Sequence, residues 1–334
     1  MNTALPSRRL FLRRGGVALA GGLALGAGRY SHAQPALEQL RILCSGPAGS
    51  IPDTIARRVA DQLTGRFAHS AIVENRPGAA GQIAVGALKT AASGASTLLL
   101  AQGAIATVYQ FLYPRLAYDP GSDLQPVSLA GEMTLALAVG PAVPPRIQTV
   151  RDLADWMRRN PKLANAGSPG TGTLPHLLEF MLFRELDVPW QHVAYSGGPP
   201  AIADLLGGQI ASLVLPEGLL RPHRAAGRLR LLATGGAQRS AYLPDVPTLA
   251  EQGHPDLVVG EWFAFFMSAK ASASAIEAAS AAIGSALGRP ELVAAFAESG
   301  MVAGASTPSA LAMRVAAEQR YWEPILRTAG IRVE

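Results

Sequence analysis

The sequence has one cysteine, Cys44, among 334 residues, so no disulfide can form within the chain. It has no Cys, His and carboxylate group at metal-ligand spacing and no phosphate-binding P-loop. After the N-terminal stretch, no apolar run reaches the length of about 20 residues that a membrane-spanning helix needs. These absences exclude a disulfide framework, a zinc site and a P-loop nucleotide site, and we expect no cofactor or metal.

Acidic residues are missing from the first 33 positions, which hold five of the 29 basic residues. The 24 remaining basic residues balance the 24 acidic ones, so the pI near 9.6 describes the N-terminal stretch and not the body. A neutral body argues against a nucleic-acid or membrane-surface partner.

Residues 1–33 are predicted to be an export signal. An arginine-rich start precedes an apolar run over 15–28 and the small-x-small site Ser31-His32-Ala33. Residues 7–13 resemble the twin-arginine (Tat) consensus, and an ordinary Sec signal is the alternative. We therefore expect a periplasmic protein whose signal is cleaved after Ala33.

Strand and helix patterns alternate from 41 to about 235, which predicts an α/β protein with mostly parallel sheets. Capping boxes are expected at Ser50/Asp53 and at Thr149/Asp152. Helices are predicted over about 272–287, 291–299 and 308–328.

Two short strands run into Gly/Pro/Ser turns that open helices. The first comprises strand 41–44 and turn 45–52, and the second comprises strand 163–166 and turn 167–172. A helix N-terminus has unpaired N–H groups and a partial positive charge, so each turn is a candidate anion site. The pair predicts two α/β lobes that face one small acidic ligand.

The second turn is the richest candidate site. Gly170-Thr171-Gly172 begins like a dinucleotide fingerprint, but Pro175 replaces the third glycine and no acidic residue follows at the usual distance. Ser168 only partly matches a nucleophile elbow, and no histidine has a clear acidic partner at suggestive spacing. The favoured interpretation is a turn that holds a carboxylate, and the alternative is a plain βα turn.

For two single residues near the predicted turns, the sequence allows more than one role. His176 either contacts a ligand or caps and packs its helix, and Asp53 either receives a ligand ammonium or complements the helix dipole. Cys44 is predicted to be a buried strand residue, and Trp262 is predicted to lie in the core.

Several ordered blocks of the chain, from about 41 to 334, resemble the solute-binding proteins of tripartite tricarboxylate transporters, the Bug family. The blocks are Val73-Glu74-Asn75-Arg76-Pro77-Gly78-Ala79-Ala80-Gly81, Thr97-Leu98-Leu99-Leu100, Tyr118-Asp119-Pro120, Gly167 to Thr173 with His176, Tyr195-Ser196-Gly197, Asp204 to Gln209 and Leu243 to Glu251.

The resemblance implies a type II periplasmic-binding-protein fold: two α/β lobes, joined by two crossing segments, close on a ligand. Lobe 1 is expected over 34–138 and 258–334, and lobe 2 over 139–257. The expected partners are a small carboxylate, held partly through water, and two integral-membrane transporter subunits, and we expect a monomer that is no enzyme. The expected ligand-binding residues are Ala48, Gly49, Ser50, Asp53, Ser168, Gly170, Thr171, Gly172, Thr173, His176, Tyr195 and Gly197.

The first turn departs from the family pattern. Cys44-Ser45-Gly46 replaces an opening with an aromatic residue, and Ser50 replaces a second glycine, which predicts a reshaped turn. Ser196 stands where Lys or Arg is common. Two other functions stay open: a ligand sensor that signals to a membrane protein, and an exported hydrolase that uses Ser168.

Overall fold

The computed structural model describes residue 1 and residues 37–92 and 94–329. Apart from residue 1, the predicted export signal lies outside the described residues. The described residues from Leu37 onward form one compact unit. Within the described residues, no helix combines the length and apolar character needed to cross a bilayer.

The compact unit is built from ten strands and interleaved helices. The strands are β1 (Leu37–Cys44), β2 (Ala68–Asn75), β3 (Thr97–Gln102), β4 (Leu124–Val139), β5 (Asn165–Ser168), β6 (Gln191–Ala194), β7 (Ser212–Pro216), β8 (Arg230–Thr234), β9 (Gly260–Ser268) and β10 (Met301–Ala303). The helices are α1 (Ile51–Leu63), α2 (Gln82–Thr90), α3 (Ala104–Thr107), α4 (Tyr109–Leu112), α5 (Pro120–Asp123), α6 (Val150–Arg159), α7 (Leu174–Glu185), α8 (Gly198–Leu206), α9 (Glu217–Ala225), α10 (Ala273–Leu287), α11 (Pro290–Glu298) and α12 (Pro308–Ala329). Three short 3-10 turns are η1 (Ala79–Gly81), η2 (Pro161–Leu163) and η3 (Ala250–Gln252).

The strands pair in the order β2-β1-β3-β9-β4-β7-β5-β6, and β8 and β10 also pair with β4. Pairing is parallel around β1 and around β5, where helices make the crossovers. Every pairing of β4 or β9 is antiparallel. The prediction of mostly parallel sheets was therefore wrong for the middle of the molecule, where long strands run between the two parallel groups.

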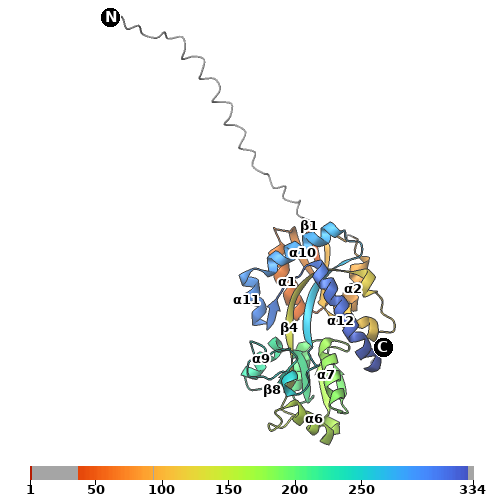
Figure 1. Cartoon of the computed structure of the whole chain (residues 1–334), viewed down its shortest axis with the longest axis vertical. Helices are drawn as coiled ribbons and strands as arrows, with labels where there is room; N and C mark the ends of the chain where they lie inside the picture. Colours follow the sequence, from red (N-terminus) through yellow and green to blue (C-terminus); the bar gives the residue numbers. More distant parts are fainter. Residues whose placement is uncertain (2–36, 93, 330–334) are drawn as a thin grey trace. The chain divides into compact units, whose positions relative to one another are not determined.

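Strand β4 joins two halves of the sheet (Figure 1). Its residues 124–134 pair with β9, and its residues 135–139 pair with β7 and β8. A second crossing lies beside it, where the Val259 N–H donates to the Gly235 carbonyl (2.9 Å) and Gly260 pairs with Thr134. We call β1, β2, β3, β9 and β10 with their helices the first half, and β5 to β8 with theirs the second half. The predicted lobe boundaries stay a prediction.

Most predicted elements are present, with shifts at their ends. The Thr149/Asp152 capping box is confirmed. The second short strand begins at Asn165, not at Leu163, because Pro161 starts a 3-10 turn over 161–163, so Gly167 and Ser168 belong to the strand. Helix α9 was missed. Cys44 and Trp262 are core residues, as predicted, with 0% and 1% of their surfaces exposed.

An ion pair links the first two strands. Arg41 Nε lies 2.8 Å from Glu74 Oε1, and Arg76 donates to Glu74 Oε2 (3.1 Å). The hydrogen bond from Arg41, assisted by Arg76, lowers the pKa of Glu74 from 4.5 to about 2. The pKa of Glu74 is lower in the folded protein than in the unfolded chain, so its ionised form stabilises the fold. This stabilisation is complete above pH 4.5 and is lost as the pH falls towards 2.

Glu74→Gln should therefore lower the free energy of unfolding at pH 7 by about 1 kcal/mol, a modest amount because both side chains are partly exposed. Urea unfolding of both proteins from pH 7 down to about pH 2.5 measures the gap. The gap should close on acidification, and a constant gap would contradict the ion-pair assignment.

Candidate functional site

The first turn, residues 45–50, is held from within by Asp53. The Asp53 carboxylate accepts from Gly49 N–H (2.8 Å), from the Asn75 amide (2.8 Å) and from Arg57 Nε (3.1 Å), and Arg57 Nη2 lies 3.0 Å from its other oxygen in an ion pair. Burial acts to raise the pKa of Asp53, but the bonds from Arg57, Gly49 and Asn75 outweigh it and hold that pKa below its usual value. These contacts engage both carboxylate oxygens. Asp53 therefore braces the turn, and the structure favours this role over contact with a ligand ammonium.

The expected capping box at Ser50 and Asp53 was wrong. The Ser50 hydroxyl donates to the Pro47 carbonyl (2.6 Å) and caps no helix N–H, and Asp53 reaches Gly49 instead of Ser50. Ser50 has extended backbone (φ −76°), so serine is accommodated there without strain, while Gly49 has φ +78°. Ala48 and Gly49 are exposed, and the Ala48 N–H has no backbone partner within the described chain.

The second turn follows β5 and opens α7. The Gly170 carbonyl accepts from the hydroxyls of Ser168 (3.1 Å) and Thr173 (2.7 Å) and from Thr173 N–H (3.3 Å). The Gly172 N–H donates to His176 Nδ1 (3.0 Å). Among the described residues, neither the N–H nor the hydroxyl of Thr171 has a partner. Thr171 is therefore the donor that this turn can offer to an anion.

Two neutral histidines support the second turn. His176 and His192 stack with ring centroids 3.8 Å apart, and His192 Nε2 lies 2.8 Å from Ser168 Oγ. Burial, with a contribution from His192, lowers the pKa of His176 to about 3, and burial lowers that of His192 to about 4. Both rings are uncharged above about pH 5. Since His176 is buried and bonded to Gly172, the structure favours its capping role over ligand contact.

Tyr195 and Gly197 lie at the end of the neighbouring strand β6. The Tyr195 N–H donates to the Ser168 carbonyl (3.0 Å), and its hydroxyl donates to Asp204 (2.8 Å). Gly197 has φ +131° and precedes α8. The tyrosine hydroxyl is therefore engaged within the second half, and this region offers a ligand the ring and the backbone of the 195–197 segment.

The second turn lies directly against the first half. A methyl group added at Gly172 would lie 2.9 Å from Leu112 Cδ1 and 3.8 Å from Tyr109 Cε1 and from the Tyr113 hydroxyl. Tyr109 leads back to the first turn through Gln102, whose amide nitrogen lies 3.3 Å from the tyrosine hydroxyl and whose oxygen accepts from Ser45 (2.9 Å). An array of hydrogen-bonded residues, Ser45, Gln102, Ala80 and Tyr109, therefore runs from the first turn to the residues that lie beside Gly172 in the second turn. It begins at Ser45 and not at Ala48 or Ser50.

A strained loop forms part of this array. Four consecutive residues, Gly78 to Gly81, have φ of +119°, +45°, +52° and +95°. Left-handed backbone is unfavourable for alanine, by about 1–2 kcal/mol per residue. The Ala80 carbonyl accepts from Gln102 (2.7 Å) and from Tyr109 (3.1 Å), which fixes the loop beside Ser45. Strain retained in this way marks a candidate functional loop.

Sequence reasoning missed Gln102, Tyr109 and Tyr113 as members of this array. Gln102 is the last residue of β3, Tyr109 begins α4 and Tyr113 directly follows it, and none of them carries a glycine-rich or capping signature. Their position at the carboxyl end of a strand parallel to β1 was the available signal, since ligands of parallel α/β sheets bind at that edge.

The Ser168–His192 contact does not make a catalytic triad. Ser168 has no exposed surface, and within the described residues no carboxylate bonds to His192. A serine nucleophile needs access to its substrate and an oriented base. The pair instead fixes the end of β5 relative to β6.

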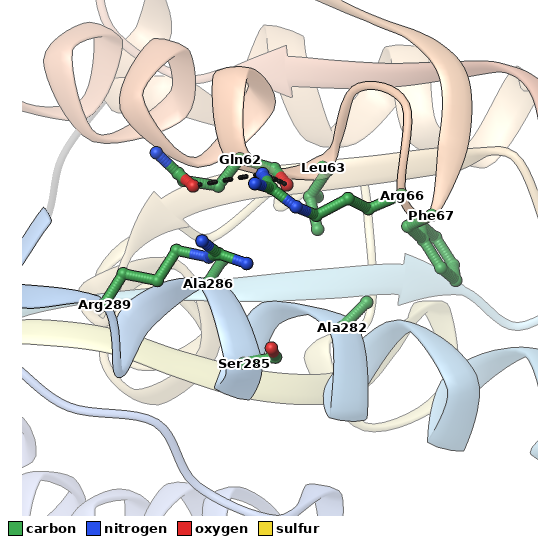
Figure 2. A pocket seen from close by; sticks show the side chains of 8 residues that line it. All are labelled: Gln62, Leu63, Arg66, Phe67, Ala282, Ser285, Ala286 and Arg289. Carbon is green, nitrogen blue, oxygen red and sulfur yellow. Dashed lines mark hydrogen bonds between the residues drawn. The ribbon is translucent and has the colours of Figure 1, made fainter.

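Two cavities lie outside the turns. One of about 180 Å³ lies between α1 and α10, with Arg66 and Arg289 pointing into it from opposite sides (Figure 2). No predicted site residue lines it. The other cavity, of about 430 Å³, lies beside the two crossings.

The described residues contain no cluster of three His, Cys, Asp or Glu side chains fit for a metal ion.

Comparison with known proteins places these features in context. A family model described as "Tripartite tricarboxylate transporter family receptor" matches residues 55–331. Protein BugT of Bordetella pertussis is 29% identical over 296 residues, which cover 88% of this chain and 90% of BugT.

Solved structures show the same fold. A structure of an R. palustris protein with adipate has a TM-score of 0.81 at 26% identity and covers 88% of this chain and 98% of its own. MatC of Rhodopseudomonas palustris, with bound malate, has a TM-score of 0.79 at 25% identity and covers 86% of this chain and 98% of its own.

Proposed function

The chain belongs to the tripartite tricarboxylate transporter receptor family, and from this premise we propose that it captures a small carboxylate between its two turns for a tripartite membrane transporter. The family consists of solute-binding receptors, so the chain is a receptor and not an enzyme. The sequence resemblance and the expected fold class are confirmed.

The observation that carries the proposal is the junction of the second turn with the first half. Among the described residues, the N–H and hydroxyl of Thr171 have no partner, and Thr171 precedes Gly172, where an added methyl group would lie 3.8 Å from Tyr109 and from Tyr113. Both nearby histidines are neutral, so a carboxylate here would be held by neutral donors and ordered water. Relatives solved with adipate and malate bind dicarboxylates, which supports a ligand of that class.

The remaining parts of the proposal concern the cell. We propose that residues 1–33 direct export by the Tat route, that cleavage follows Ala33, and that the monomeric receptor delivers its ligand to two integral-membrane subunits. Export supplies the compartment in which receptors of this family work, and the arginine-rich start supports the route.

A thermal-shift screen of the chain from Gln34 onward against a carboxylate panel, with malate and adipate included, tests the proposal. A ligand that binds only the native state must raise the melting temperature. A shift for one chemical class, confirmed by calorimetry, supports capture. A flat panel from a well-folded protein would overturn carboxylate capture and favour a sensor with another ligand.

Gly170→Leu should abolish carboxylate binding without unfolding the protein. Gly170 has φ +153°, which a side chain rarely adopts, and an added Cβ meets Thr173 at 3.4 Å. The turn must therefore change shape at the residue that adjoins Thr171. Calorimetry with the ligand found in the screen gives the affinity, and circular dichroism checks the fold. Wild-type affinity in a folded variant would contradict the site assignment.

A further inference from the structure

The 430 Å³ cavity lies where the two halves meet, and its size suits a small ligand. It is lined by both crossings, by β10 and by one face of α12. It touches the predicted carboxylate site only at Leu174, which follows Thr173. This cavity is therefore a separate feature that the proposed function does not use.

Three carboxylates and one guanidinium line the cavity. Arg314 pairs with Glu132 and with Glu318, whose Oε1 lies 2.9 Å from Arg314 Nε. The second oxygen of Glu318 accepts from the indole of Trp262 (3.0 Å), and Arg314 stacks 4.7 Å from that ring. The single cation is thus shared by two carboxylates, and the third, Glu261, has no cationic partner among the described residues.

Glu261 is the unpartnered group. It is 6% exposed, and its Oε1 accepts only from the adjacent Trp262 N–H (3.2 Å). Its Oε2 has no hydrogen bond with any described residue, although the side chain lines the cavity. Glu261 is therefore a largely buried carboxyl group with one oxygen that no described residue engages, and a ligand in the cavity can supply the missing donor.

We propose that this cavity binds a small organic cation, a primary ammonium on an apolar body, with the ammonium against Glu261. The excess of carboxylates selects a cation. The apolar body would contact Val259, Tyr321 and Trp322, which also line the cavity. This proposal does not depend on carboxylate capture at the turns.

Binding should release a proton. Burial, with a contribution from Glu318, raises the pKa of Glu261 to about 8, so the empty site carries a neutral carboxylic acid at pH 7. The other titratable groups that face it are Glu132 on β4, Tyr109 on α4, and Arg314, Glu318 and Tyr321 on α12. When the ammonium enters, the Glu261 carboxyl gives its proton to the buffer, and an ion pair forms.

Isothermal titration of the full chain with phenethylammonium chloride tests this. At pH 7, in two buffers of different ionisation enthalpy, we expect release of close to one proton per bound amine. Affinity should rise about fiftyfold from pH 6 to pH 8, because the fraction of Glu261 that is already ionised rises by that factor when its pKa is about 8. No binding at 10 mM amine, or an affinity that does not change with pH, would overturn the proposal.

Glu261→Gln should weaken binding at least tenfold and remove the proton release, since the amide mimics the neutral acid but cannot ionise. Glu277→Gln, at an exposed position on α10, is the matched control and should bind as the wild type does. N-acetyl-lysine amide carries the same ammonium on a peptide-like body. Binding of N-acetyl-lysine amide without binding of phenethylammonium would overturn the proposal of a free amine and indicate a protein lysine at this site. Unchanged binding by a folded Glu261→Gln protein would contradict the role of Glu261.

Discussion

Replacing Gly172 by valine should weaken carboxylate binding by up to about 3 kcal/mol, roughly a hundredfold in Kd, while the chain still folds. Gly172 has φ +80°, and a Cβ there would lie 2.9 Å from Leu112 Cδ1. Leu112 belongs to the first half and Gly172 to the second, so the added side chain acts as a wedge between them. A receptor that closes on its ligand loses affinity when the closed arrangement is disfavoured.

Gly227→Val is the control for this wedge. Gly227 has φ +68°, close to that of Gly172, and an added Cβ there would meet no atom within 4 Å. Valine at Gly227 therefore causes a similar backbone strain from positive φ but adds no contact between the two halves. Calorimetry with the ligand found in the screen should show a loss of affinity in the first variant only. Equal losses in both would trace the effect to backbone strain, and unchanged affinity at Gly172→Val would contradict closure at this contact.

Replacing Gln102 by leucine should destabilise the chain by about 2–4 kcal/mol and weaken ligand binding as well. The amide joins three partners, the Ser45 hydroxyl, the Ala80 carbonyl and the Tyr109 hydroxyl. Each buried polar group left without its partner costs about 1–3 kcal/mol. The left-handed loop at Gly78 to Gly81 then loses one of the two bonds that hold Ala80, so its strained backbone should relax.

Gln125→Leu is the matched control, because Gln125 also lies on a strand and its side chain has no hydrogen bond with the described residues. Urea unfolding gives the stability of each variant, and calorimetry gives the affinity. If Gln102→Leu were as stable as Gln125→Leu, the amide would not be the link between the first turn and α4. If stability fell but affinity did not, the array would be structural only.

Local patterns in the sequence were sufficient for the elements and for the family. Apolar periodicity located the long helices, and the Thr149 and Asp152 spacing gave a capping box because both partners lie within one turn of chain. Blocks such as Gly167 to Thr173 and Asp204 to Gln209 carried the family resemblance, which fixed the fold class. These features depend on neighbours in the sequence and need no knowledge of distant contacts.

Only the tertiary structure decided what each candidate side chain does. The sequence could not decide whether Asp53 binds a ligand ammonium or complements the helix dipole. In the structure its carboxylate holds the first turn, because Asn75 and Arg57 donate hydrogen bonds to it. Ser168 is buried, and its hydroxyl lies 2.8 Å from a ring nitrogen of His192, which is 24 residues away in the sequence. The antiparallel centre of the sheet and the buried acid Glu261 likewise come from strands that meet from distant parts of the chain. Hydrogen bonds and burial are set by spatial neighbours, which sequence spacing does not specify.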